Sequence, residues 1–207
     1  MSERLQQPDL ASVEVGGMTR GAFILRSALA AGALYGAGAV TPFVERAFAQ
    51  TATSDLDIIN FALTLEYVEA AFYTQALAKA KLSPPVKKLA TELQKHETAH
   101  ATALMQAVQM LGGKPAPKPT TKFTLKNEAG FLKLAATLED TGVSAYNGAA
   151  PSISSPDLLV TAGTIVQVEA RHAAAVRFHG GQDPAPNAFD PTLTAAQVTA
   201  RIKPFVG

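Results

Sequence analysis

Two Glu-x-x-His motifs occupy corresponding places in the two halves of this sequence. The first is Glu97-Thr98-Ala99-His100, and the second is Glu169-Ala170-Arg171-His172. Each motif follows an earlier glutamate, Glu66 or Glu139, at nearly the same distance along the chain. Residues i and i+3 share one face of an α-helix, so each motif directs a carboxylate and an imidazole to the same side. The pattern therefore predicts an internal repeat built from helices.

Apolar residues recur at helical spacing from Ser54 onward and predict four helices. A serine–proline pair opens the second and the fourth helix, and a glycine pair follows the end of each. The sequence contains no alternating, β-rich run, so we expect an all-α fold. The predicted helices span 54–81, 83–111, 127–146 and 155–179. Their interior stripes are expected to be Ile58, Ala62, Leu65, Phe72 and Ala76; Leu89, Leu93, Leu104, Ala107 and Leu111; Leu132, Ala135, Leu138 and Ala145; and Leu159, Ala162, Val166, Ala173 and Val176.

The links between these helices predict how they are connected. The first and last links are short, so each pair of helices should fold as an antiparallel hairpin. The middle link, 112–126, is rich in proline and can cover about 40 Å at ~3 Å per residue. This is about the length of a helix of roughly 27 residues, so the link can cross from one end of the bundle to the other. We expect the bundle over 50–182 and a proline-rich tail over 183–207, with one short helix near 195–202.

Glutamates interrupt the apolar stripes at positions that should be buried. Glu66 follows Leu65, and Glu139 follows Leu138. An ionised carboxylate that is buried without a partner costs several kcal/mol, so buried charges are normally paired or bound to metal. Among the lysines and arginines on these stripes, only Arg171 lies near the motifs, and it is on a different helix face from His172. Carboxylates that converge without cations would repel one another, and metal ions are the natural compensation.

A resemblance to a known family rests on five stretches of the chain. They are Leu65-Glu66-Tyr67-Val68-Glu69-Ala70-Ala71-Phe72-Tyr73, His96-Glu97-Thr98-Ala99-His100, Leu111-Gly112-Gly113, Glu139 and Glu169-Ala170-Arg171-His172. Over about 54–179 the chain resembles the ferritin-like di-metal carboxylate domain, in the branch of exported bacterial ferritin-like and desiccation-related proteins. The resemblance implies a ferritin-like four-helix bundle of two antiparallel hairpins joined by a long crossover. The sequence departs from the family pattern at Gly142.

The resemblance also implies six ligands for two metal ions. They are Glu66, Glu97, His100, Glu139, Glu169 and His172. Glu97 and Glu169 would bridge the two ions. Glu66 and His100 would complete the coordination of one ion, and Glu139 and His172 that of the other. Carboxylate and imidazole ligands with room for water suit two iron ions, with two manganese ions as the alternative.

Three further residues lie next to the expected ligands: Tyr73, Tyr146 and Glu69. Each tyrosine comes two helical turns after a stripe glutamate, at equivalent places in the repeat. The tyrosines are either core aromatic residues whose hydroxyls need partners or donors of hydrogen bonds to the ligand carboxylates. Glu69 is expected to be solvated or to support the ligands from outside their shell, and it is the reserve candidate for a ligand.

The run His96-Glu97-Thr98-Ala99-His100 also fits the His-Glu-x-x-His helix of zinc proteases. In that alternative the two histidines bind zinc, and the glutamate acts as the base. It leaves the second Glu-x-x-His motif unexplained and lacks a clear third ligand. On the first hypothesis, His96 is a surface residue or a neighbour of a ligand. His179 is expected at a helix C-terminus, where the helix dipole favours it.

The first 49 residues are expected to be an export signal. A basic stretch at 18–26 leads into an apolar, Ala- and Gly-rich stretch at 27–40, and Ala47-Phe48-Ala49 provides a small-residue cleavage pattern. Residues 19–26 are similar to a twin-arginine signal but lack the second adjacent arginine. A membrane anchor and an extra helix are the alternatives. We expect a periplasmic or extracellular protein with no membrane span in its mature form.

The composition and the expected site leave three classes of function. A net charge of +1 gives no field that would attract nucleic acid or an anionic membrane. The first class is a di-iron oxidoreductase that uses oxygen or peroxide, for example to oxidise Fe(II). The second is a di-manganese enzyme that disproportionates peroxide, and the third is a metal-binding or structural stress protein without turnover. The sequence leaves open whether the chain forms a homo-oligomer.

Overall fold

The computed structural model describes residues 54–206, and the regular secondary structure in this part is helical. The expected export segment, 1–49, lies outside the described residues. Four long helices form the bundle: α3 (Asp55–Lys79), α4 (Pro84–Met110), α5 (Glu128–Ala149) and α6 (Pro156–His179). Two 3₁₀ turns, Ala150–Ser152 and Lys203–Phe205, and the short α7 (Ala195–Ile202) complete the fold. The described part of the chain contains no helix with the length and apolar character needed to cross a membrane.

Side chains at the helix starts explain where the long helices begin. The Asn127 side-chain oxygen accepts a hydrogen bond of 2.8 Å from the Gly130 N–H at the start of α5. Serine hydroxyls do the same at the starts of α3 and α6. At α4 the Ser83 hydroxyl makes no such bond, and the Ser83 backbone N–H donates instead to the Glu128 carboxylate. These contacts satisfy backbone donors that a helix N-terminus leaves free.

Glycines end α4 and α6 where the sequence predicted. Gly112 and Gly181 adopt φ of 73° and 69°, a left-handed conformation that glycine tolerates best. The third helix is longer than predicted, because α5 continues past Tyr146 to Ala149. Gly148 lies inside α5. The backbone of Leu193 passes so close to it that a Cβ atom on residue 148 would collide. This glycine therefore serves packing and does not end the helix.

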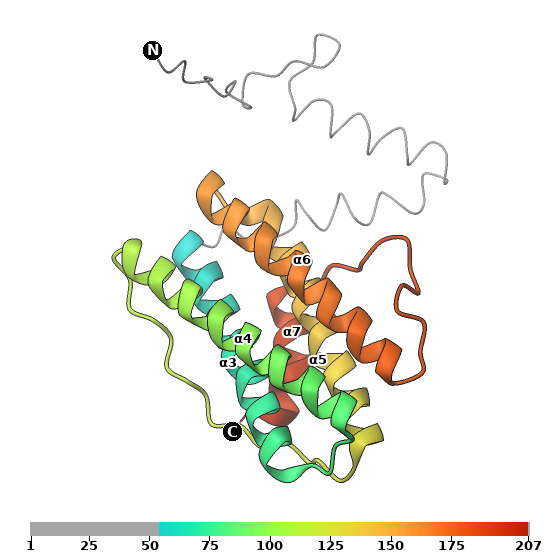
Figure 1. Ribbon diagram of the computed structural model, residues 1–207. Helices are drawn as coiled ribbons and strands as arrows, with labels where there is room; N and C mark the ends of the chain where they lie inside the picture. Colours follow the sequence, from blue (N-terminus) through green and yellow to red (C-terminus); the bar gives the residue numbers. More distant parts are fainter. Residues whose placement is uncertain (1–53, 207) are drawn as a thin grey trace, which may run out of the picture. The chain divides into compact units, whose positions relative to one another are not determined.

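The predicted topology is confirmed. Helix α3 packs mainly against α4, and α5 packs mainly against α6, so the bundle consists of two hairpins. In Figure 1 the link between α4 and α5 runs along the bundle from the end of α4 to the opposite end, where α5 begins. This crossover makes α4 and α5 parallel.

The interior has a charged middle layer with an apolar cluster on either side. One cluster centres on Phe72, Phe131 and Leu93, and the other on Leu63, Leu104 and Ile165. Each long helix has a glutamate of the predicted site between its residues of one cluster and its residues of the other. These glutamates are Glu66, Glu97, Glu139 and Glu169. The predicted stripes are correct except near the helix ends and at half-buried positions. Leu111 and Leu159 were expected to face the interior, but each is more than two-fifths exposed, and Leu158 is buried in place of Leu159.

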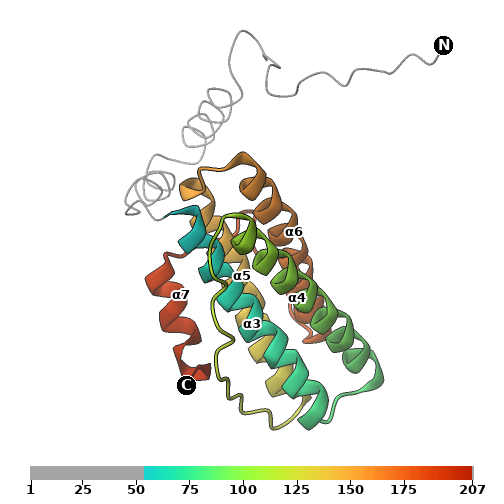
Figure 2. The same cartoon turned by 90° about the vertical axis from the view of Figure 1, so that its left-hand side faces the viewer.

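The C-terminal tail is attached to the bundle. Val198 and Ile202 of α7 are buried against Leu65 of α3 and Ala145 of α5. Figures 1 and 2 show α7 beside these two long helices. After α7 the chain meets the crossover, where the Lys122 N–H donates to the Phe205 carbonyl at 2.9 Å. The tail therefore covers the face of the bundle between α3 and α5.

Candidate metal centre

The six residues expected to bind metal converge in the charged middle layer. All four glutamates have no measurable exposure, and His172 is 3% exposed. The His100 side chain is 12% exposed. Each of the four long helices contributes: α3 and α5 give one glutamate each, and α4 and α6 each give a Glu-x-x-His pair. The six are Glu66, Glu97, His100, Glu139, Glu169 and His172.

The two histidines contact the cluster glutamates in equivalent ways. His100 Nδ1 lies 2.9 Å from Glu169 Oε1 and 3.3 Å from Glu66 Oε2. His172 Nδ1 lies 2.9 Å from Glu97 Oε1 and 3.3 Å from Glu139 Oε2. Each imidazole thus approaches the glutamate of the other Glu-x-x-His motif. It also approaches one of the two glutamates outside the motifs, which is Glu66 for His100 and Glu139 for His172. The sequence repeat is therefore also a repeat in space, with approximate two-fold symmetry.

These atoms form two overlapping groups with the spacing of metal ligands. Within each group the candidate ligand atoms lie within 4.8 Å of one another. Both groups contain Glu97 and Glu169. The remaining members are Glu66 and His100 in one group, and Glu139 and His172 in the other. The structure therefore contains a carboxylate–imidazole cluster in which two glutamates are common to both halves.

Two tyrosines cross between the hairpins and hold the stripe glutamates. The Tyr146 hydroxyl of α5 donates to Glu66 Oε1 of α3 at 2.5 Å. In the symmetry-related contact, the Tyr73 hydroxyl of α3 donates to Glu139 Oε1 of α5. Each of these carboxylates therefore has one oxygen in a hydrogen bond and one directed at the cluster.

The atoms left without partners show what the cluster lacks. Buried polar atoms normally have a hydrogen-bond partner, and a group of exceptions needs an explanation. Eight buried atoms in the described residues have no partner of suitable geometry, and all belong to the six cluster residues. Six are carboxylate oxygens, and two are imidazole Nδ1 atoms. A set of oxygen and nitrogen atoms whose lone pairs face one another fits divalent metal ions, which these atoms can coordinate together.

The electrostatics of the metal-free cluster agree with this fit. Burial raises the pKa of Glu66 to about 7, and the neighbouring charge of Glu97 adds to the rise. Burial also raises the pKa of Glu169 well above its usual range. Burial also opposes the charged form of Glu97. Contacts with His100 and His172 outweigh the effect of burial and lower the pKa of Glu97 to about 2. Without metal, protons therefore occupy part of the cluster, and metal binding must release them.

Glu69 lies beside the cluster and explains the departure at Gly142. Its side chain is buried, with 2% exposed, although it belongs to neither group of candidate ligands. A Cβ atom on residue 142 would lie 3.1 Å from Glu69 Oε1 and 3.4 Å from Glu169 Oε2. Glycine at this position leaves room for both carboxylates. Gly142 therefore makes space beside the site without interrupting α5.

His96 is a neighbour of the cluster and does not pair with His100. It is exposed, and its Nδ1 lies 3.0 Å from Nε2 of His172, with the two rings stacked at 11°. Neither group of candidate metal ligands in the described residues includes His96. The pairing that a zinc protease needs is therefore not formed. Sequence reasoning identified His96 as a spare residue but did not find its partner, because the partner lies on another helix.

Comparisons with known proteins agree with the fold. A family model described as a ferritin-like domain matches residues 54–182. A solved structure with a similar fold is the crystal structure of a conserved hypothetical protein, rv2844, from Mycobacterium tuberculosis. It is 20% identical with a TM-score of 0.57, and the match covers 65% of this chain and 96% of that chain. At this level of identity the likeness supports the fold alone. No curated protein matches this chain.

Proposed function

This chain belongs to the ferritin-like domain family, and on that premise we propose that it binds a dinuclear metal centre and uses it for oxidoreductase chemistry. The metal we propose is iron, and the co-substrate is oxygen or peroxide. The observation that carries the proposal is the set of eight buried, unpaired atoms on six converging side chains. Apart from the cluster's own two histidines, no basic side chain in the described residues forms an ion pair with these carboxylates.

The two halves of the cluster suggest how the ions would be held. Glu97 and Glu169 belong to both groups and would bridge the ions. Glu66 with His100, and Glu139 with His172, would each complete one ion's shell. Hard carboxylates combined with imidazoles favour iron or manganese over softer metals. When bound, such ions supply the capacity to exchange electrons with oxygen or peroxide.

The chain itself would orient the ligands and keep bulk water out. Hydrogen bonds from Tyr73 and Tyr146 fix the outer oxygens of two ligand carboxylates. Partners of this kind orient ligands and raise metal affinity. Apolar clusters lie on both sides of the charged layer and shield it from solvent along the bundle axis.

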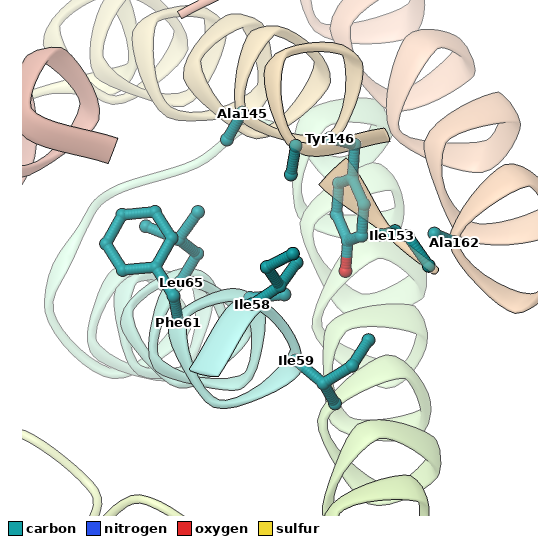
Figure 3. Close-up of a pocket in the computed structure, with 10 residues that line it drawn as sticks. Ile58, Ile59, Phe61, Leu65, Ala145, Tyr146, Ile153 and Ala162 are labelled. Atoms are coloured by element: carbon teal, nitrogen blue, oxygen red, sulfur yellow. The ribbon is translucent and has the colours of Figure 1, made fainter. Parts of the chain in front are cut away.

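A small apolar cavity next to Tyr146 favours a co-substrate of the size of oxygen. It has a volume of about 20 Å³, which is room for one molecule of about the size of water. Figure 3 shows Tyr146 among the apolar residues that line it, including Ile58, Leu65 and Ala162. A wider cavity of about 260 Å³ shares Ile58 with it and extends to the exposed Asp57. A small molecule that passed from the wider cavity to the smaller one would arrive at Tyr146, the tyrosine that holds Glu66.

Elemental analysis of the purified chain tests the proposal. We expect two equivalents of iron in protein purified without chelator, and loss of both in the double variant Glu97→Ala, Glu169→Ala. The matched control, Glu92→Ala with Asp157→Ala, removes one exposed carboxylate each from α4 and α6 and should keep both ions. Manganese in place of iron would favour peroxide disproportionation. A chain that takes up no metal under loading conditions would be a structural bundle, and the proposal would be wrong.

We also propose that residues 1–49 direct export and are removed. The support is the sequence pattern alone, since this segment lies outside the described residues. Mass spectrometry of the chain from the periplasmic or culture fraction should give a mass that corresponds to a start near Gln50. A full-length chain that stays in the cytoplasmic fraction would contradict export.

A further inference from the structure

The cluster is nearly symmetric, and two positions break the symmetry. One helical turn after the stripe glutamates, α3 has Glu69 where α5 has Gly142. Immediately before the motif glutamates, α4 has His96 where α6 has Val168. In both pairs, one half of the repeat has a polar side chain, and the other half has none that can form a hydrogen bond. The two metal positions therefore have different surroundings.

Glu69 adds a carboxylate to one side of the cluster. Its Oε1 and Glu169 Oε2 flank the same point, the place where residue 142 would carry a Cβ atom. Glu169 Oε2 is the oxygen on the His172 side, at 3.9 Å from His172 Nδ1, whereas Glu169 Oε1 is 2.9 Å from His100. Gly142 is also on the same helix as Glu139. The extra carboxylate therefore lies on the side of Glu139 and His172.

Glu69 has no other group to neutralise it. Over residues 54–206 its side chain makes no ion pair and no hydrogen bond, and with 2% of it exposed its oxygens are not among the eight fully buried, unpartnered atoms of the cluster. A buried carboxylate without a partner is costly. A metal ion on the Glu139 side of the cluster would give Glu69 the positive charge that the protein does not provide.

His96 strengthens the same side of the cluster. His172 directs Nδ1 at Glu97 and Glu139, and its Nε2 faces His96 Nδ1 at 3.0 Å. If Nδ1 binds a metal, Nε2 carries the proton and donates it to His96. Such a hydrogen bond fixes the orientation of the imidazole and makes it a better ligand. His100 gains no such partner from Val168, whose side chain is apolar.

These contacts lead to one inference, which rests on the proposed function. We propose that the two metal positions are unequal, and that the position formed by Glu139 and His172 binds metal more tightly and fills first. Glu69 serves this position as an additional carboxylate, and His96 serves it as the positioning residue of His172. The position formed by Glu66 and His100 fills second.

Stepwise titration of the metal-free protein with Mn²⁺ tests the order of filling, with calorimetry for the constants and electron paramagnetic resonance for free Mn²⁺. The parent should bind two ions with dissociation constants at least about tenfold apart. Two matched variants each remove one imidazole ligand. His100→Ala should keep the tight step and lose the weak one, and His172→Ala should keep only a weak step.

Two further variants test the residues that break the symmetry. His96→Ala should weaken the tight step about 10- to 100-fold, the usual effect of removing the partner of a metal ligand, and should leave the weak step unchanged. His96→Gln, which keeps an acceptor, should restore part of the loss. Glu69→Gln should weaken the tight step by about tenfold or more and bring the two constants together.

The outcomes separate this inference from the proposed function. Two ions bound with equal constants, or equal effects of His100→Ala and His172→Ala, would overturn the inference and leave the dinuclear centre standing. No binding of two ions by the parent would overturn both. Circular dichroism of each metal-free variant checks that it folds. If His172→Ala does not fold, Glu69→Gln decides, and an unchanged tight step in that variant would contradict the inference.

Discussion

Tyr146 on α5 donates its hydroxyl proton to Glu66 on α3, so a hydrogen bond between the two hairpins holds a carboxylate of the cluster. We predict that Tyr146→Phe leaves Glu66 Oε1 without a partner and destabilises the metal-free protein by about 1–3 kcal/mol. Metal affinity should fall about 10- to 100-fold. Urea unfolding and Mn²⁺ titration measure the two effects. Tyr67→Phe is the control, since Tyr67 is outside the cluster, and it should change neither quantity.

Gly142 and Gly163 offer a matched pair of glycines within long helices. A Cβ atom at residue 163 would meet nothing within 4 Å, whereas one at residue 142 would crowd Glu69 and Glu169. Gly163→Ala should therefore stabilise the protein by up to about 1 kcal/mol, the helix preference of alanine over glycine. Gly142→Ala should lose that gain and weaken Mn²⁺ binding. Equal stabilisation by both substitutions, with unchanged metal binding, would show that residue 142 has no special role.

Much of this fold could be predicted from the sequence because the signals are local. Helical periodicity, serine–proline starts and glycine stops depend on neighbouring residues, and they placed α4 and α6 to within a residue or two. The cluster was predictable for the same reason, since Glu97 with His100 and Glu169 with His172 each share a helix face. The repeat then related the two halves.

The sequence does not reveal features that depend on contacts between distant segments. Gly148 resembles a helix stop, but the backbone of Leu193 requires a glycine there, and α5 continues. His96 has no sequence signal for its contact with His172, because the two residues lie on different helices. Gly142 weakens a helix by local rules, and only the position of Glu69 across the interface explains it.

A contact between the starts of α4 and α5 should make stability depend on acid pH. The hydrogen bond from the Ser83 backbone N–H lowers the pKa of Glu128. A carboxyl whose pKa is lower in the folded state stabilises the protein above its unfolded pKa of about 4.5, and this contribution is lost as pH falls below that value. Glu128→Gln should therefore lower the melting temperature at pH 7 and have a smaller effect near pH 3.

Glu92→Gln is the control for this pH dependence. Glu92 is an exposed carboxylate, and its partner is the exposed Lys95 on the same helix. Exposed pairs of this kind contribute little to stability. A melting-temperature loss for Glu128→Gln that is the same at pH 7 and pH 3 would show that the ionised form of Glu128 is not what stabilises the contact.

Removal of metal should destabilise the protein because the buried glutamates then depend on protons and on the two histidines to offset their charge. A ligand that binds only the folded state stabilises it by about 2.7 kcal/mol when its free concentration is 100 times its dissociation constant. Chelation should therefore lower the melting temperature of protein shown beforehand to contain metal, and added Mn²⁺ or Fe²⁺ should restore it. The double variant Glu97→Ala, Glu169→Ala has lost the two shared carboxylates, so its melting temperature should not respond to chelator or metal. An unchanged melting temperature in the metal-loaded parent after complete chelation would mean that the buried glutamates are neutralised by protons alone, and that the cluster does not need metal to be stable.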